Sequence, residues 1–282
     1  MPTVTSPDGT SIASETQGEG PPVILVDGAL GCRALGVQRK LAGLLADRFR
    51  VVTYDRRGRG QSGDTPPYAI EREIDDVEAL VAAAGGSTCL YGISSGAALA
   101  LEAATRLTGV ARLALYEAPF IVDATRTPIT DDYLATLESL VARGRRGAAV
   151  KHFLRAGVQL PAPMVALMPL MPAWRKLKAV AHTLPYDARI VAGHQRGEPL
   201  PAGRWDAVTA PTLVADGAKS PEWMRNANAA LAAAVPGAVH RRLSGQTHMV
   251  KAPALAPVLA EFFAGGNGAS VGEARPRPQA AA

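Results

Sequence analysis

The pentapeptide Gly-Ile-Ser-Ser-Gly at residues 92–96 is the feature that most restricts how this chain can fold. It follows an apolar, strand-like run at residues 88–91 and precedes an Ala- and Leu-rich segment at residues 97–107. Where a strand turns at once into a helix, the middle serine is held in a strained backbone conformation, with its hydroxyl exposed above the sheet. The flanking glycines leave room for strand and helix to pass closely. This pattern, a nucleophile elbow, makes Ser94 the candidate nucleophile.

Composition excludes several classes of protein. The chain has 282 residues and is 48% hydrophobic, which is enough for one large α/β domain with an inserted subdomain. Its 30 Lys and Arg residues against 25 Asp and Glu are scattered apart from short clusters, so nucleic-acid binding is not expected. The start lacks the pattern of a signal peptide, and no apolar run reaches roughly 18 residues. We expect a soluble, cytoplasmic protein with no membrane span.

The order of apolar segments predicts the fold class. Continuous apolar runs typical of strands buried on both faces occur at residues 23–26, 51–54, 89–91, 113–116 and 212–215. Helical patterns lie between them, as at residues 69–84, and two short strands at residues 3–6 and 10–15 open the chain as a hairpin. Alternating strands and helices indicate an α/β fold, with a mostly parallel central sheet covered by helices on both faces.

The alternation stops between residues 117 and 211, which predicts an inserted helical lid. We assign residues 1–117 and 208–264 to the core, residues 118–207 to the lid and residues 265–282 to a flexible, Gly- and Pro-rich tail. The lid contains large, soft side chains that could line an apolar pocket, although each is more often ordinary lid core. They are Phe153, Met164, Met168, Met171 and Trp174.

A serine hydroxyl is a poor nucleophile unless a base removes its proton. Of the five histidines, only His248 sits in a short loop between a late strand, residues 239–243, and a final helix. Such loops gather at the carboxyl edge of a parallel sheet, where the elbow also lies, so His248 is the candidate general base. Packing or surface roles are expected for the other four, His152, His182, His194 and His240.

The order Ser94 then His248, the elbow and the lid after the sixth strand resemble the α/β-hydrolase superfamily, over residues 3 to 263. Tyr-Asp-Arg-Arg-Gly-Arg-Gly-Gln-Ser at residues 54–62 looks like its D-x-R-G-x-G-x-S loop. Asp-Gly-Ala-Leu-Gly at residues 27–31 stands in the place of its H-G-x-x-G oxyanion loop. The resemblance implies an oxyanion hole made by the backbone N–H groups of Ala29 and Ser95, and a serine enzyme that needs no cofactor or metal.

Two positions depart from the superfamily's pattern. Most members have histidine where this chain has Asp27, and an ionised carboxylate facing the oxyanion would oppose catalysis. We expect its side chain to turn away and to accept backbone hydrogen bonds within the loop. The second departure is the triad acid, which usually ends a G-x-x-D sequence after the seventh strand. Here residues 217–220 end in serine.

Some members of the superfamily place the acid at the end of the sixth strand instead. Leu-Tyr-Glu-Ala-Pro-Phe at residues 115–120 looks like that arrangement, so the resemblance implies that Glu117 is the acid. Its task would be to hold His248 in the correct tautomer. Asp216 and then Asp123 are the alternatives, and a structural salt bridge at the start of the lid is the other role open to Glu117.

One rival motif is rejected on its context. Residues 58–63 match G-x-G-x-x-G after a strand, which is the pattern of a dinucleotide site. That fingerprint must open a helix at once, whereas Asp-Thr-Pro-Pro follows at residues 64–67 and its prolines block the helix.

These observations predict a serine hydrolase that cleaves a carboxylic ester, thioester or lactone through an acyl-enzyme on Ser94. The apolar lid favours a small, moderately hydrophobic substrate. Carbon–carbon bond hydrolysis, cofactor-free perhydrolysis and biosynthetic acyl transfer or cyclisation use similar residues and stay open. A ligand-binding protein that keeps the pocket without the chemistry is the alternative of a different class. Substrate identity and oligomeric state are not specified by the sequence.

Overall fold

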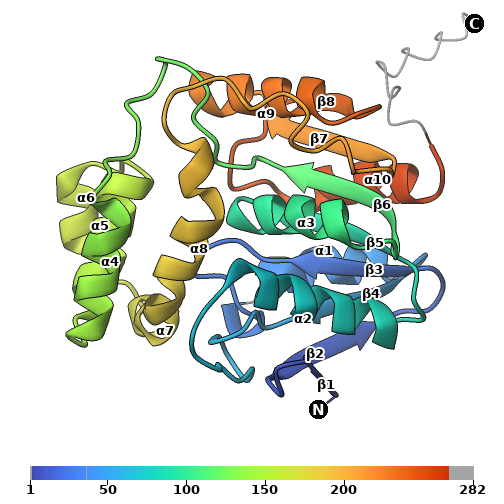
Figure 1. Ribbon diagram of the computed structural model, residues 1–282, viewed down its shortest axis with the longest axis horizontal. Helices are drawn as coiled ribbons and strands as arrows, with labels where there is room; N and C mark the ends of the chain where they lie inside the picture. Colours follow the sequence, from blue (N-terminus) through green and yellow to red (C-terminus); the bar gives the residue numbers. More distant parts are fainter. Residues whose placement is uncertain (1, 36, 267–282) are drawn as a thin grey trace, which may run out of the picture.

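The computed structural model describes residues 2–35 and 37–266 and contains one eight-stranded sheet (Figure 1). The strands follow the order β1-β2-β4-β3-β5-β6-β7-β8, in which the pairs β1–β2 and β2–β4 are antiparallel and the others parallel. Their bounds are β1 Thr3–Thr5, β2 Ser11–Gln17, β3 Pro22–Val26, β4 Arg50–Tyr54, β5 Thr88–Ile93, β6 Val110–Tyr116, β7 Thr212–Gly217 and β8 Val239–Leu243. The predicted mostly parallel sheet is therefore confirmed, and the expected hairpin is formed by β1 and β2.

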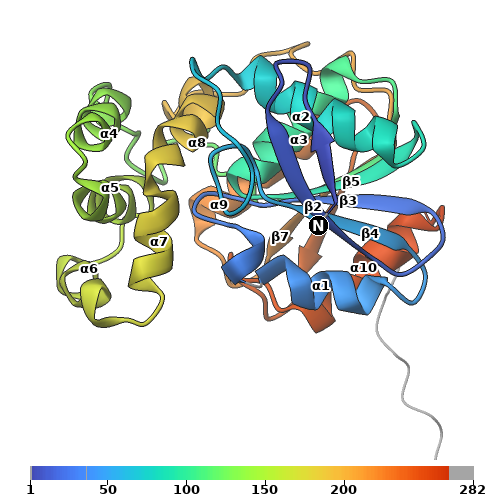
Figure 2. The same ribbon diagram turned by 90° about the horizontal axis from the view of Figure 1, so that it is seen from below.

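Helices cover both faces of the sheet (Figure 2). Helices α1 (Val37–Leu45) and α10 (Ala252–Phe263) pack on one face, and α2 (Ile70–Ala83), α3 (Ser95–Arg106) and α9 (Glu222–Ala234) pack on the other. Alternate residues of β3 point to opposite sides, since Ile24 joins the α2–α3–α9 core and Leu25 joins the α1–α10 core. Burial on both faces explains why these strands are continuously apolar in sequence.

The predicted helix boundaries are nearly correct. Helix α2 spans Ile70–Ala83 where residues 69–84 were expected, and α3 begins at Ser95, two residues earlier than the apolar pattern indicated. The earlier start follows from the turn itself, because Ser94 is the residue that caps α3 and the helix begins directly after it. Most of the expected tail, residues 267–282, lies outside the described residues.

A helical insertion separates β6 from β7, as predicted (Figure 1). Its helices are α4 Tyr133–Ala142, α5 Arg146–His152, α6 Ala162–Leu167, α7 Trp174–Val180 and α8 Leu184–Val191, with short turns η2 Phe153–Gly157, η3 Met168–Leu170, η4 Ala181–Thr183 and η5 Ala192–His194. The insertion has its own apolar core, in which Leu137, Val150 and Leu184 are fully buried. Leu30, from the loop after β3, belongs to the same core, so the insertion packs directly on that loop.

No helix in the described part of the chain is both long enough and apolar enough to cross a bilayer.

Candidate active site

Ser94 occupies the sharp turn between β5 and α3. Its backbone lies in the left-handed region, with φ 58° and ψ −130°, which costs a non-glycine residue about 1–3 kcal/mol. Its own N–H is held by the carbonyl of Tyr116 on the neighbouring strand at 2.9 Å. A side chain at Gly92 would collide with the backbone of Gly96, and one at Gly96 would stand 2.5 Å from the carbonyl oxygen of Asp27. Both glycines of the pentapeptide are therefore required for the close passage of strand and helix.

The loop after β3 lies directly against Ser94. A methyl group placed on Gly28 would stand 2.9 Å from Ser94 Cβ and 3.5 Å from Ser94 Oγ. Within the described part of the chain, the N–H of Ala29 donates to no other group. The N–H of Ser95 is in the first turn of α3, where N–H groups have no acceptor within the helix. The positive end of the α3 dipole adds to the field of these donors.

His248 and Glu117 are brought together from positions 131 residues apart. His248 Nδ1 lies 2.9 Å from Glu117 Oε2, so the carboxylate accepts the Nδ1 hydrogen and leaves Nε2 free to exchange a proton. The His248 side chain is 38% exposed, whereas Glu117 is fully buried. An imidazole held in this way has a fixed tautomer and a solvent-accessible face, which is the arrangement that a general base needs.

Glu117 is held by more than His248. Its backbone has φ 49°, and its Oε1 accepts a 2.7 Å hydrogen bond from the N–H of Gly217 and another from the Ser220 hydroxyl. Ser220 is the residue that stands where most members of the superfamily carry the acid. The hydroxyl at that position thus donates to the Glu117 carboxylate, and every oxygen of this buried carboxylate has a partner.

The two alternative acids are engaged elsewhere. Asp216 is buried in an ion pair with Arg242, at 2.7 Å, and lies 2.6 Å from His240 Nε2. Asp123 accepts hydrogen bonds from Thr125 and from the Asn226 amide. In the described part of the chain, Glu117 is the carboxylate that is hydrogen-bonded to His248.

The remaining histidines lie in other surroundings. His152 stacks on Tyr133, and His194 packs against both the Phe120 and the Trp205 ring. Burial lowers the pKa of both imidazoles. His182 stands 4.0 Å from Asp64, and His240 contacts Asp216. In the described part of the chain none of these four imidazoles is hydrogen-bonded to Glu117; two pack on aromatic rings and two lie beside a carboxylate.

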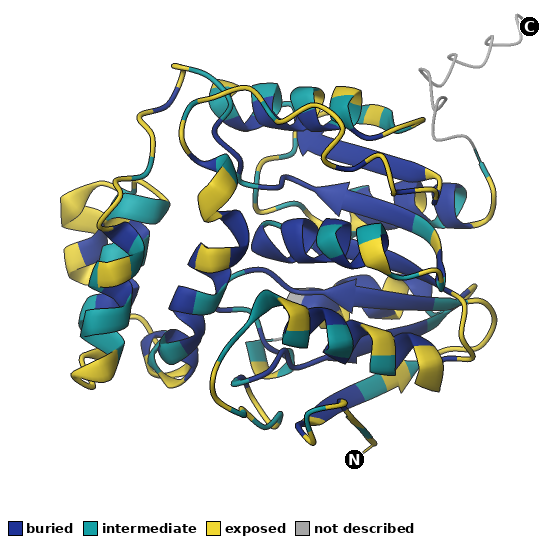
Figure 3. Cartoon of the chain, in the orientation of Figure 1, coloured by how far each residue is buried: buried dark blue, intermediate teal, exposed yellow. Residues whose placement is uncertain are grey.

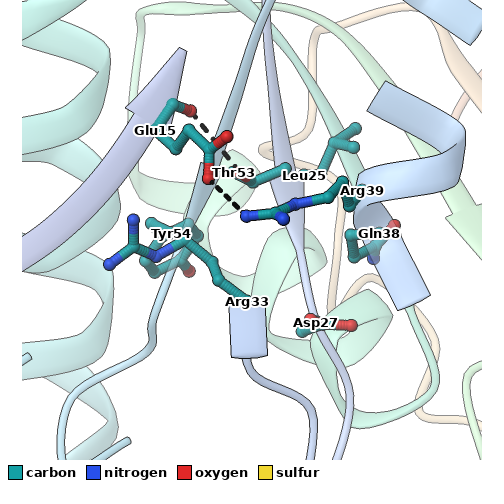
Figure 4. Close-up of a pocket in the computed structure, with 8 residues that line it drawn as sticks. All are labelled: Glu15, Leu25, Asp27, Arg33, Gln38, Arg39, Thr53 and Tyr54. Carbon is teal, nitrogen blue, oxygen red and sulfur yellow. Dashed lines mark hydrogen bonds and ion pairs between the residues drawn. The ribbon is translucent and has the colours of Figure 1, made fainter. Parts of the chain in front are cut away.

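Asp27 lines a small cavity on the α1 side of the sheet, together with Leu25 and Gln38 (Figure 4). The carboxyl group is packed against Gly31, where a methyl group would stand 2.7 Å from Asp27 Cγ. Among the described residues no backbone N–H donates to it, so the expectation of backbone hydrogen bonds within the loop is wrong. Burial instead raises the pKa of Asp27 to about 6, against the opposing charges of Arg59 and Arg56. The N–H groups of Gly31 and Arg33 donate instead to the Gly28 carbonyl and to Asp55, while the Asp27 carboxyl is enclosed between the loop and α1.

A buried network of charges ties this loop to the insertion; we call it the Asp187 network. Its members are Arg56, Arg59, Glu73, Ser95 and Asp187, all at most 3% exposed. The carboxylate of Asp187, on α8, accepts hydrogen bonds from Arg56 at 2.7 Å, from Arg59 at 2.6 Å and from the Ser95 hydroxyl at 2.8 Å. Burial alone would raise the pKa of Asp187, but the charges of Arg59 and Arg56 outweigh it and lower that pKa.

The same arginines hold the backbone of the loop after β3. Arg56 Nη1 donates to the carbonyl of Asp27 at 3.1 Å, and Arg59 Nη1 donates to the carbonyl of Gly28 at 2.6 Å. These carbonyls belong to the peptide units that precede Ala29, so the two arginines restrict the movement of the Ala29 N–H. The Asp187 network therefore connects three parts of the site: the loop, the start of α3 and the insertion.

The family follows from comparison with known proteins. A model of the alpha/beta hydrolase family matches residues 31–259. The chain belongs to this family. A solved alpha/beta hydrolase from Sphaerobacter thermophilus is similar to it, with 49% identity and a TM-score of 0.85 over 93% of this chain and 100% of that one.

Two more distant structures share the fold of this hydrolase family member. An esterase from Thermogutta terrifontis is 22% identical with a TM-score of 0.67, over 93% of this chain and 97% of that one. An enol-lactonase from Burkholderia xenovorans is 21% identical with a TM-score of 0.67, over 93% of this chain and 100% of that one. The first curated relatives that the chain matches align with 28% of this chain and only 14% of their own length.

Sequence reasoning missed two residues of this site. Ser220 was recognised only as the absence of the usual acid, although a hydroxyl at that position is a natural donor to a carboxylate on the adjacent strand. Asp187 was not recognised at all. The available signal was the Arg-rich loop at residues 56–59, since three arginines that are all buried require buried carboxylates to pair with.

Proposed function

We propose that this family member is a cofactor-independent serine hydrolase that cleaves a carboxylic ester, thioester or lactone. Ser94 Oγ attacks the carbonyl carbon while His248 Nε2 takes the hydroxyl proton. The backbone N–H groups of Ala29 and Ser95 donate to the oxygen that becomes negative in the tetrahedral intermediate. His248 then gives the proton to the leaving alcohol or thiol, and an acyl-enzyme remains. Water, activated by the same imidazole, releases the acid and restores Ser94.

The hydrogen bond between His248 Nδ1 and Glu117 Oε2 is the observation that carries this proposal. A buried carboxylate on Nδ1 stabilises the imidazolium that forms when the serine proton is transferred. The strain at Ser94 and the approach of Gly28 to its hydroxyl add support, because the nucleophile then lies directly against the loop that carries the Ala29 N–H. A structural role for Glu117 would not require its partner to be a half-exposed imidazole in the loop after β8.

The proposed substrate class agrees with the names of two structural neighbours, an esterase and an enol-lactonase. Both reactions attack an acyl carbon bonded to oxygen, and a lactone is a cyclic ester. The fold alone is shared at this level of identity, so the argument for the chemistry comes from this chain's own side chains.

A fluorophosphonate probe tests the proposal, because it forms a covalent bond only with an activated serine. We expect the wild-type protein to gain the mass of one phosphonyl group, localised to Ser94 by peptide mass spectrometry. Labelling should be absent in Ser94→Ala and retained in Ser244→Ala, which removes an exposed hydroxyl in the same loop as His248. Folded wild-type protein that takes no label would instead indicate a ligand-binding member of the fold.

A panel of p-nitrophenyl esters of increasing acyl length, together with simple lactones and thioesters, then defines the substrate. Turnover of esters that is lost in Ser94→Ala is the expected result. Turnover confined to carbon–carbon substrates would replace the ester assignment and keep the same nucleophile.

A further inference from the structure

The insertion carries a charge unlike that of the rest of the molecule. Between Glu138 and Asp187 the chain contains no acidic residue. The same stretch contains the basic residues Arg143, Arg145, Arg146, Lys151, Arg155, Arg175, Lys176 and Lys178. Since the whole chain has a formal charge of +5, the residues outside this stretch sum to −3. The positive charge of the protein is therefore concentrated on one part of the insertion.

Five of these cations line one open groove between α5 and α7. They are Arg145, Arg146, Lys151, Arg175 and Lys178. No acidic side chain lines the groove, and the side chains of Lys151 and Arg175 make no hydrogen bond or ion pair with any described residue. Clustered positive charges without counter-ions give the groove a positive electrostatic potential. The groove therefore attracts an anionic surface.

An exposed apolar segment adjoins this groove. Residues 157–173 contain no charged side chain, and most of them face solvent. Leu170 is 81% exposed, Leu167 62% and Met164 51%. Met171 and Val158 are exposed as well, so five of the seven exposed large hydrophobic side chains of the described residues lie in this one segment. Monomeric proteins rarely leave such a group open unless it is a binding surface.

The groove and the segment form one face. Pro169, which lines the groove, belongs to η3 and lies between Leu167 and Leu170 in sequence. Helix α6 and the turn that follows it stand at the end of the insertion away from the sheet (Figure 2). The exposed colouring of α6 contrasts with the buried strands of the core (Figure 3). We call this face, formed by residues 143–178, the lid face.

We propose that the lid face docks on an anionic phospholipid bilayer. Its cations match the headgroup phosphates, and its leucine and methionine side chains match the boundary between headgroups and acyl chains. Both kinds of group are needed by a protein that lies on a bilayer without spanning it. A purely acidic protein segment would pair with the cations but would leave the exposed leucines uncovered, whereas a bilayer covers both. This inference is independent of the proposed chemistry at Ser94.

Co-sedimentation with vesicles tests the proposal on the full-length protein. The vesicles are either pure phosphatidylcholine or phosphatidylcholine with 30 mol% phosphatidylglycerol, in about 0.1 M salt. We expect the protein to sediment with the anionic vesicles, to remain in solution with the zwitterionic ones, and to be released as salt increases. The same results are expected for Ser94→Ala, so vesicle binding is read separately from hydrolysis.

Charge reversal on the lid face is compared with a matched reversal elsewhere. Lys151→Glu/Arg175→Glu should weaken binding at least about 30-fold, because each cation near an anionic surface contributes a factor of about five. Lys40→Glu/Arg48→Glu makes the same change in net charge at exposed positions outside the insertion and should weaken binding less than about threefold. Equal losses in the two variants would show attraction by net charge alone and would overturn the proposal.

The contribution of the exposed leucines to bilayer binding is tested with its own control variant. Leu167→Asp/Leu170→Asp should abolish sedimentation, whereas Leu44→Asp, at an exposed leucine on α1, should leave it unchanged. Circular dichroism and the melting temperature verify that each variant is folded. The proposal falls if folded wild-type protein stays in solution with anionic vesicles. It also falls if the leucine variants bind as well as wild type and polyglutamate competes fully, since the face would then take an acidic protein.

Discussion

The hydroxyl of Ser95 donates a 2.8 Å hydrogen bond to the carboxylate of Asp187, which links the helix that begins beside Ser94 to a helix of the insertion. We expect Asp187→Asn to lower kcat by about tenfold or more, because small displacements of oriented donors are costly. It should also reduce the free energy of unfolding by about 3 kcal/mol, because the buried Arg59 loses its counter-charge while Arg56 keeps only its ion pair with Glu73. Ester hydrolysis and chemical denaturation measure the two effects.

Asp76→Asn is the matched control for that variant. Asp76 forms a buried ion pair with Arg57, in the same loop as Arg56 and Arg59, but among the described residues it is hydrogen-bonded neither to Ser95 nor to the loop after β3. A similar loss of stability with nearly unchanged kcat is expected. If the two variants lose activity equally at a temperature where both are folded, the Asp187 network has only a structural role.

Glu117→Gln should reduce kcat by about 10³- to 10⁴-fold, because an amide on Nδ1 stabilises the wrong tautomer and does not stabilise the imidazolium. Asp216→Asn should keep near-normal turnover, since its partners are Arg242 and His240. Steady-state kinetics on one ester distinguish the two. Normal turnover of Glu117→Gln would remove Glu117 from the mechanism.

Gly28→Ala should reduce kcat/KM by about 100-fold, since the added methyl would stand 2.9 Å from Ser94 Cβ and displace the loop that carries the Ala29 N–H. Gly43→Ala, on the open face of α1, has nothing within 4 Å of the added carbon. It should leave kinetics unchanged and raise stability by up to about 1 kcal/mol. Wild-type kinetics in Gly28→Ala would contradict the placement of the loop against the nucleophile.

Asp27 predicts a pH dependence of stability. Its pKa in the folded protein, about 6, is above the ordinary value of 3.8. The native state therefore binds this proton more tightly than the unfolded state, and that contribution is complete below pH 4 and lost as pH rises through about 6. The free energy of unfolding of the wild type, compared with that of Asp27→Asn, should therefore fall by up to about 3 kcal/mol across this pH window. Urea unfolding from pH 4 to 8 measures it.

Asp47→Asn serves as the reference for that series, because Asp47 is exposed. It should follow the wild-type pH profile. If the pH profile of Asp27→Asn runs parallel to that of the wild type from pH 4 to 8, the Asp27 carboxyl is ionised throughout that range.

The fold was predictable because its signals are local. Runs such as residues 23–26 and 113–116 are apolar at every position, which only burial on both faces explains, and the Gly–x–Ser–x–Gly turn fixes where β5 ends and α3 begins. The candidate site was predictable to the extent that its residues sit in loops at the sheet's carboxyl edge. His248 followed from its position, whereas Glu117 followed from resemblance to a family.

The rest depends on contacts that no local pattern encodes. Asp187 is one carboxylate on a lid helix, and its partners Arg56 and Arg59 are more than 120 residues away. Met164 and Met171 were expected to line a pocket or pack in the lid core, yet both are exposed. Which apolar side chains a short helix buries depends on how the helices of the insertion pack, and sequence spacing in six- or seven-residue helices does not determine that packing.

The link through Asp187 limits how freely this architecture can be recombined. Lids of related proteins are natural parts to exchange when new specificity is sought. Here a chimera that replaced α8 would remove the counter-ion of Arg59 and one of the two counter-ions of Arg56. Replacing the insertion with that of another protein would therefore succeed only if the new segment supplied an acidic side chain at the position of Asp187.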